Sequence, residues 1–223
     1  MSLQLLPFYL VCDESGSMSG EPIDAINASL PDLHAEIGSN PVVADKTRFC
    51  LIGFSDRADI LLPLSDLSTV TTMPKLDAKG GTSYAKAFDM LRQTIDSDVA
   101  ELKRDGHEVY RPAVFFLSDG QPNDDWHAAF AALTDGGWRP HPNILAFGFG
   151  QADESIIRQV ATTRAFIADG TMGPAQALRE FAQSLIRSIV NSGTQSGADP
   201  SGGATLVMPD EVPGFTAISA DPI

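Results

Sequence analysis

Apolar and polar positions alternate in blocks along the chain, in a pattern typical of strands that alternate with helices. Short apolar runs are followed by segments in which apolar residues recur every three or four positions. We predict six strands, over residues 8–12, 48–54, 59–64, 112–117, 143–149 and 164–168. We predict helices over residues 23–37, 88–102, 126–133, 154–161 and 174–189. This succession indicates βαβ units around a mostly parallel sheet.

The pattern predicts one Rossmann-like, doubly wound α/β domain with helices on both faces of a six-stranded sheet. A tight turn before residue 59 makes the strand over 59–64 an antiparallel partner at the edge of the sheet. Pro31 should kink or divide the first helix, because proline lacks a backbone N–H. The composition changes after residue 191, so we expect a domain over 1–191, followed by a flexible linker and a C-terminal tail over 192–223.

Charge and apolar content restrict the classes of partner. The net charge of −14 argues against nucleic acid and anionic membranes, which need a positive surface, and suits cations or basic partner surfaces. Acidity that only maintains solubility is an equally good explanation. We expect no membrane span, because no apolar run reaches roughly 18 residues. Residues 1–7 lack the features of a signal peptide, so we expect a cytoplasmic protein in which Cys12 and Cys50 are buried free thiols.

Oxygen-bearing side chains occur in three segments near the predicted C-terminal edge of the sheet. Asp13, Ser15 and Ser17 follow the first strand, Thr82 precedes the second helix, and Asp119 follows a later buried strand. Ligands of open α/β sheets bind at this edge. Oxygen donors suit a hard cation such as Mg²⁺. These five side chains are therefore candidate ligands of one divalent metal ion.

Each of these segments also has a purely structural explanation. Ser15 and Ser17 can satisfy backbone donors before a helix. Thr82 can cap the helix that follows it, and Asp119 belongs to a common Asp-Gly turn pair. The positions of all three segments, at strand ends and at a helix start, favour the metal site.

These residues resemble a known family. The motif Asp-Glu-Ser-Gly-Ser over residues 13–17 matches the DxSxS motif of von Willebrand factor A (VWA) domains, and Thr82 and Asp119 match the remaining two metal positions of that family. The resemblance covers roughly residues 5–191. The amino-acid sequence is also similar to the bacterial TerY-like branch of tellurium-resistance-associated proteins. This similarity lies in four segments, 6–9, 17–23, 80–82 and 116–126.

The resemblance implies the VWA fold and a metal-ion-dependent adhesion site (MIDAS). In such a site Ser15, Ser17 and Thr82 would bind Mg²⁺ directly, with Mn²⁺ or Ca²⁺ as alternatives, while Asp13 and Asp119 would act mainly through water. Few direct charges leave the ion electrophilic, so it takes one more anionic oxygen, which a partner protein's Asp or Glu can donate. The resemblance also implies a non-catalytic adaptor that works beside a PP2C-type phosphatase and a kinase-like protein in a bacterial stress-response or tellurite-resistance system.

The chain departs from the family pattern at two positions. Glu14 stands where many members have an uncharged residue, and Ser118 replaces a frequent threonine. We expect the charge of Glu14 to raise the affinity for the ion and to weaken the attraction for an acidic partner.

Two other classes of function stay open. A Mg²⁺-dependent hydrolase or phosphatase could also place an aspartate at the end of the first strand. A phosphatase of the haloacid-dehalogenase type needs a second carboxylate two residues later, where this chain has Ser15. Neither Ser15 nor Ser17 lies in the G-x-S-x-G motif of a serine hydrolase. The other alternative is a structural module with a vestigial metal site.

Overall fold

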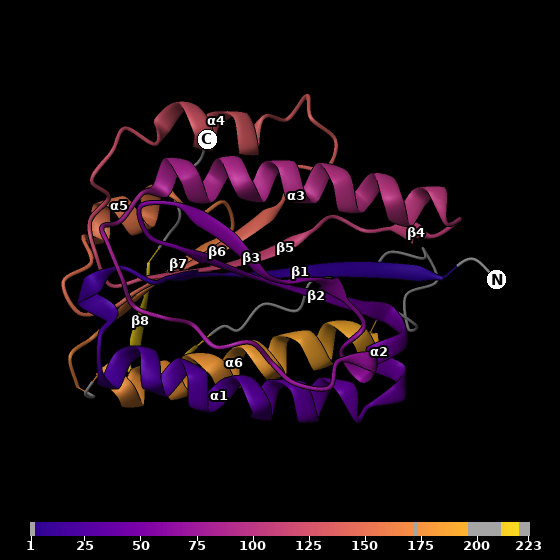
Figure 1. Ribbon diagram of the computed structural model, residues 1–223, viewed down its shortest axis with the longest axis horizontal. Coiled ribbons are helices and arrows are strands. Elements are labelled where there is room, and N and C mark those ends of the chain that lie inside the picture. Colours follow the sequence, from indigo (N-terminus) through magenta and orange to yellow (C-terminus); the bar gives the residue numbers. More distant parts are fainter. Residues whose placement is uncertain (1–2, 172–173, 196–210, 219–223) are drawn as a thin grey trace.

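A computed structural model describes residues 3–171, 174–195 and 211–218. These residues form three layers, with one sheet between two groups of helices (Figure 1). Helices α1, α2 and α6 cover one face, and α3, α4 and α5 cover the other. The α/β class, the doubly wound arrangement and the mostly parallel sheet predicted from the sequence are confirmed.

The described residues contain eight strands, in the order β3-β2-β1-β5-β6-β7-β8, with β4 also paired to β1. Their bounds are β1 (Gln4–Asp13), β2 (Thr47–Phe54), β3 (Ala58–Ser65), β4 (Glu108–Val109), β5 (Ala113–Ser118), β6 (Asn143–Gly148), β7 (Arg164–Ala168) and β8 (Phe215–Ile218). The prediction of six strands with one antiparallel edge was therefore wrong in number. The sheet has an antiparallel pair at each edge, β2 with β3 and β7 with β8.

Six α-helices connect these strands in the described residues. They are α1 (Glu21–Gly38), α2 (Pro41–Lys46), α3 (Tyr84–Arg104), α4 (His127–Thr134), α5 (Glu154–Gln159) and α6 (Pro174–Gln195). Helix α1 continues through Pro31, which is exposed, so the expected division of this helix does not occur. Helix α2 has no counterpart in the sequence prediction. Asn40 caps it and Pro41 begins it, but it has too few turns to show an apolar period.

Strand β8 lies within the stretch for which the sequence predicted a tail. It pairs antiparallel with β7, with Ala165 opposite Ile218 at one end and Ala168 opposite Phe215 at the other. The Phe215 ring meets the Phe147 ring edge to face. The division of the chain at residue 191 stays a prediction. Residues 196–210 and 219–223 of the predicted tail lie outside the described residues.

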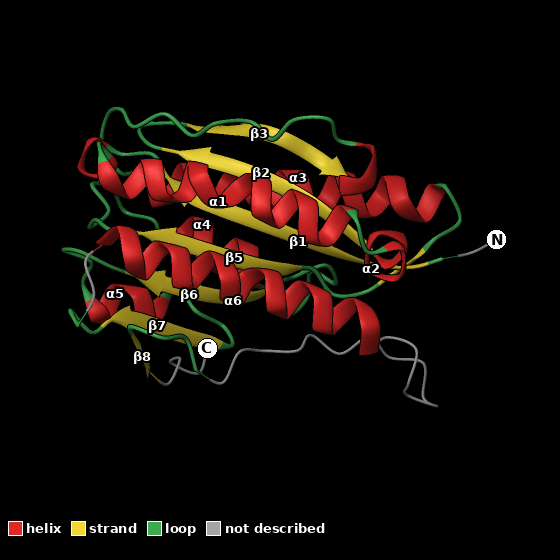
Figure 2. Ribbon diagram, turned by 90° about the horizontal axis from the view of Figure 1, so that it is seen from below, coloured by secondary structure: helices red, strands yellow, loops and turns green. Residues whose placement is uncertain are grey.

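Side chains that alternate along β1 supply the cores on both faces of the sheet. Leu10 and Cys12 pack toward α1 and α6, while Tyr9 and Val11 pack toward α3. Cys12 and Cys50 are both buried free thiols, as predicted, and they face opposite layers. Figure 2 looks onto the layer of α1 and α6, which lie across the sheet.

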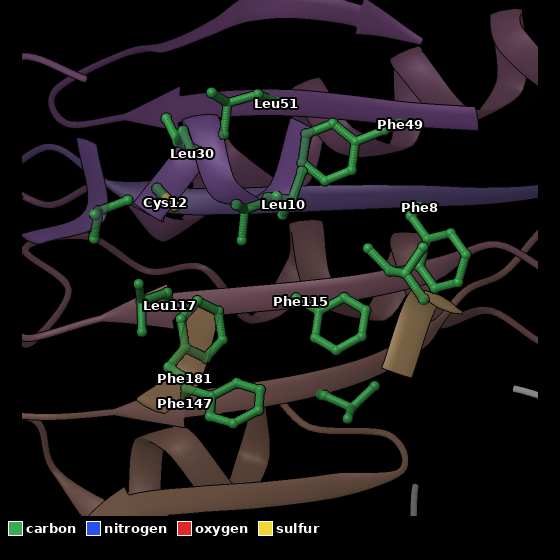
Figure 3. Packing of buried hydrophobic residues seen from close by; sticks show 14 of the residues in the cluster. Phe8, Leu10, Cys12, Leu30, Phe49, Leu51, Phe115, Leu117, Phe147 and Phe181 are labelled. Atoms are coloured by element: carbon green, nitrogen blue, oxygen red, sulfur yellow. The ribbon is translucent and has the colours of Figure 1, made fainter. Parts of the chain in front are cut away.

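Aromatic rings fill the core beneath α1 and α6. Figure 3 shows Phe8, Phe115, Phe147 and Phe181 in this layer. The centroids of Phe147 and Phe181 are 4.6 Å apart in an edge-to-face pair. This packing holds the parallel strands β1, β5 and β6 in a fixed arrangement, which determines where their C-terminal ends lie.

None of the helices in the described ranges has the length and apolar character that crossing a membrane requires.

Phe116 is the central ring of the core beneath α3, so its removal should destabilise the fold. Its centroid lies 4.9 Å from Tyr84, 5.3 Å from Phe54 and 5.4 Å from Phe88. We expect Phe116→Ala to lower the free energy of unfolding by about 3–5 kcal/mol in urea denaturation. Val42→Ala, at a half-exposed position, should change it by about 0.5 kcal/mol or less. Equal effects of the two substitutions would contradict this packing account.

Candidate metal site

The five predicted ligands come from three connections at the C-terminal edge of the sheet. Asp13 ends β1 and Ser118 ends β5, and these neighbouring strands run parallel, so both chains leave the sheet at the same edge. Ser17 lies in a short 3-10 helix over Gly16–Met18. The third segment, over residues 80–83, leads into the N-terminus of α3.

Asp13 joins the segment that follows β1 to the end of β5 through both oxygens of its carboxylate. Its Oδ1 accepts the backbone N–H of Ser15 at 2.8 Å, and its Oδ2 accepts the hydroxyl of Ser118 at 2.5 Å. The Asp13 side chain is fully buried. The last residue of β5 therefore orients the carboxylate at the end of β1.

Ser17 connects the DxSxS segment to Asp119. The Oγ atoms of Ser15 and Ser17 lie 2.9 Å apart, and the Ser17 hydroxyl donates to Asp119 Oδ1 at 2.8 Å. Ser17 is exposed, whereas Ser15 and Asp119 are buried. The cluster is thus open to solvent on the side of Ser17.

Thr82 reaches the same cluster across Gly120. A Cβ atom added to Gly120 would lie 3.3 Å from Thr82 Oγ1, and 3.9 Å from both Asp13 Oδ2 and Ser17 Oγ. Oxygens from two segments, residues 13–17 and Thr82, therefore lie around Gly120, and a side chain at residue 120 would press on the Thr82 hydroxyl. Within the described residues, the Thr82 hydroxyl donates no hydrogen bond to a protein acceptor.

Burial controls the protonation of the two acids in this cluster. It raises the pKa of Asp13 from 3.8 to about 6, while the hydrogen bonds from Ser118 and Ser15 act in the opposite direction. Burial also raises the pKa of Asp119. No Lys or Arg of the described ranges hydrogen bonds to either carboxylate. A cation at this place would compensate both negative charges.

The donor set fits a hard divalent cation. It consists of three hydroxyls and two carboxylates, all oxygen donors, around a space that Gly120 keeps open. In the described ranges, no group of three or more His, Cys, Asp and Glu side chains could hold a metal ion. A metal here would therefore depend on the hydroxyls as well as on the carboxylates.

Glu14 holds the segment before Thr82 against the sheet, a role that sequence reasoning missed. Its Oε1 accepts the N–H of Asp77 at 2.7 Å, and its carbonyl accepts the N–H of Lys79 at 2.6 Å. A Cβ on Gly53 would lie 2.1 Å from Glu14 Oε2, so only glycine leaves room for this carboxylate against β2. The carboxylate of Glu14 is thus turned to the segment that precedes Thr82, and the effect of its charge on the affinity for an ion stays a prediction.

Asp56 and Ser118 are two further residues that build the site and were not predicted as ligands. Asp56 Oδ1 accepts the N–H of Gly81 at 3.0 Å, which fixes the backbone next to Thr82. The Ser118 hydroxyl orients Asp13, as described above. Ser118 could have been noticed from its place directly before Asp119, whereas Asp56 gives no signal because its contact spans 25 residues.

The fold and this cluster define a class of α/β domain with oxygen-bearing side chains gathered at the carboxyl edge of its sheet. The von Willebrand factor type A domain family matches residues 8–190. The chain belongs to this family.

Several solved structures share the fold. The pilus adhesin SpaC from Lactobacillus rhamnosus GG aligns with a TM-score of 0.64 at 15% identity, over 85% of this chain and 30% of that one. The ArnB paralog VWA2 from Sulfolobus acidocaldarius aligns with a TM-score of 0.57 at 18% identity, over 84% and 46%. Proximal thread matrix protein 1 from the mussel byssus, with a zinc-occupied MIDAS motif, aligns with a TM-score of 0.59 at 15% identity, over 85% and 48%.

The chain spans less than half the length of these three proteins. No curated protein matches the chain.

The raised pKa of Asp13 predicts that the metal-free protein loses stability as pH rises. The folded state holds the proton more tightly than the unfolded state, so the destabilisation begins near the unfolded pKa of 3.8 and is complete above about 6. We expect this group to contribute a loss of about 3 kcal/mol in the free energy of unfolding. Urea denaturation in EDTA at pH 5 and pH 7.5 measures part of this change.

Asp13→Asn is the matched variant for this experiment, because it removes the titrating proton and retains an acceptor oxygen. It should reduce the fall in stability between the two pH values. An unchanged pH dependence in Asp13→Asn would contradict the assignment to Asp13.

The position of Glu14 predicts an indirect role in metal binding, in which its carboxylate holds the segment that precedes Thr82. Glu14→Ala leaves the Asp77 N–H without its acceptor and should weaken binding of a divalent metal about tenfold, as removal of a group that orients a ligand commonly does. Glu14→Gln keeps an acceptor oxygen and should restore most of the affinity in titration calorimetry. Equal loss in both variants would show that the charge acts instead of the hydrogen bond.

Proposed function

We propose that the chain is a metal-dependent protein-binding module, in which Ser15, Ser17 and Thr82 hold a divalent cation directly, and Asp13 and Asp119 act mainly through water. The observation that carries this proposal is the convergence of hydroxyls and carboxylates from three segments around the space beside Gly120. The zinc-occupied MIDAS motif of the mussel protein supports a metal at this place in the fold. We propose Mg²⁺ as the ion, because all the donors are oxygens.

The partner is a protein that donates an Asp or Glu carboxylate to the ion. Hydroxyl ligands leave much of the ion's charge uncompensated, so an additional anionic oxygen binds favourably. The exposed Ser17 lies on the side of the cluster from which such a group can approach. Asp13 and Asp119 are buried, so an approaching partner meets the exposed Ser17 before it meets these carboxylates.

The module acts as a non-catalytic adaptor in the cytoplasm, in the TerY-like branch of the family. Its partners in a bacterial stress-response or tellurite-resistance system include a PP2C-type phosphatase and a kinase-like protein. The similarity of segments 6–9, 17–23, 80–82 and 116–126 to that branch supports this part of the proposal. Ser15 stands where a haloacid-dehalogenase phosphatase would need its second carboxylate, which favours binding over hydrolysis.

The proposal predicts that Thr82→Ala weakens binding of Mg²⁺ and Mn²⁺ about tenfold or more, because it removes a direct ligand. Titration calorimetry with the metal alone measures this affinity. Thr72→Ala, at an exposed position outside the cluster, is the matched control and should leave the affinity unchanged. Wild-type affinity in Thr82→Ala would contradict the proposed ligand set.

A second measurement separates the adaptor from an enzyme. The wild-type protein with Mg²⁺ or Mn²⁺ should not hydrolyse a phosphomonoester such as para-nitrophenyl phosphate. Turnover that Asp13→Asn abolishes would overturn the adaptor and support a phosphatase.

A further inference from the structure

A basic cavity lies at the opposite edge of the sheet from the metal cluster. It has a volume of about 330 Å³ and is lined by the last turns of α3, by the segment that joins β4 to β5, and by the segment that joins α4 to β6. Figure 1 shows α3 running the length of the molecule, from the metal edge to the edge where β4 lies. The two sites are therefore separated by most of the length of α3.

The charges around this cavity contrast with those of the whole chain. Acidic residues outnumber Lys and Arg by 29 to 15. The cavity is nevertheless lined by Lys103, Arg111 and Arg139, together with His141, and by no Asp or Glu. Three cationic groups thus surround a concave surface on an otherwise acidic protein.

None of these three cations forms an ion pair with an acid among the residues that the structure describes. The ion pairs in the described ranges are His127 with Asp125 and Arg158 with Glu154, and neither involves the cavity. Asp135, which is close in sequence to Arg139, turns its Oδ1 to the N–H of Gly137 at 2.9 Å. The cavity therefore presents positive charge that is available to a ligand.

Two of the lining residues are held in place by the walls of the cavity. Arg111 Nη1 donates to the carbonyl of His141 at 2.8 Å, which ties the two connecting segments together and leaves the other guanidinium N–H groups for a ligand. His141 Nδ1 donates to the carbonyl of Trp138 at 2.9 Å, so Nε2 is the ring nitrogen that stays available. A guanidinium that is already positioned loses less entropy when it binds an anion.

We propose that this cavity binds a small phosphomonoester that carries an apolar group. A phosphomonoester has a charge near −2 and three acceptor oxygens, which match two guanidinium groups and an ammonium group. Val99, Val109 and Pro112 supply an apolar part of the lining for the rest of the ligand. The volume lies at the lower end of the range of about 300–1,000 Å³ that is typical of small-molecule pockets.

Titration calorimetry of the full chain with phenyl phosphate tests this proposal. Working in EDTA removes the metal site from the experiment, so failure here leaves the proposed adaptor function untouched. Phenyl phosphate should bind saturably with one site per chain and more tightly than inorganic phosphate. Amide NMR shifts should change over residues 109–111, 136–139 and 141.

Two substitutions and a matched control identify the site. Arg111→Gln and Arg139→Gln should each weaken binding about tenfold, because each removes a charge-assisted hydrogen bond. Arg104→Gln removes an exposed arginine from the same last turn of α3 but outside the cavity lining, and it should have little effect. Equal weakening by Arg104→Gln, or no saturable binding by the wild type, would overturn the proposal. Tighter binding of a phosphoserine peptide than of phenyl phosphate would overturn it in favour of a protein ligand.

Discussion

The burial of Asp13 without a basic neighbour is the constraint on which the site depends. This carboxylate ends the central strand β1, is fully buried, and faces only hydroxyl and backbone donors among the described residues. A buried acid of this kind must take up a proton or share a cation. Asp119 brings a second acid into the same network through Ser17, which strengthens the demand for positive charge. The divalent ion that we propose would compensate both acids at neutral pH.

The fold fixes the positions of the residues that form this site. Parallel pairing of β1 with β5 places Asp13 beside Ser118, and the segment before α3 is held by contacts with Glu14 and Asp56. Two glycines leave room for these contacts. A side chain at residue 53 would collide with the Glu14 carboxylate, and a side chain at residue 120 would press on the Thr82 hydroxyl. The same sheet separates this acidic edge from the basic cavity at the far end of α3. One domain thus presents two surfaces of opposite charge.

Much of this arrangement could be predicted from the sequence, because apolar periodicity and strand-end carboxylates are local signals. The parallel core strands and the five clustered side chains were identified in this way. The short strands β4 and β8 were not, because each is defined by pairing with a distant strand rather than by its own pattern. The roles of Glu14 and Asp56 were missed for a related reason, since their partners lie 63 and 25 residues away. Helix α1 also continued through Pro31, so the division that local preference allowed there did not occur.

The most direct test of this account is anomalous X-ray diffraction from a crystal of the protein grown with Mn²⁺. The account predicts one strong anomalous peak beside Gly120, within coordination distance of the hydroxyl oxygens of Ser15, Ser17 and Thr82. A crystal that shows no peak there at saturating Mn²⁺, or a peak whose ligands exclude these three hydroxyls, would contradict it.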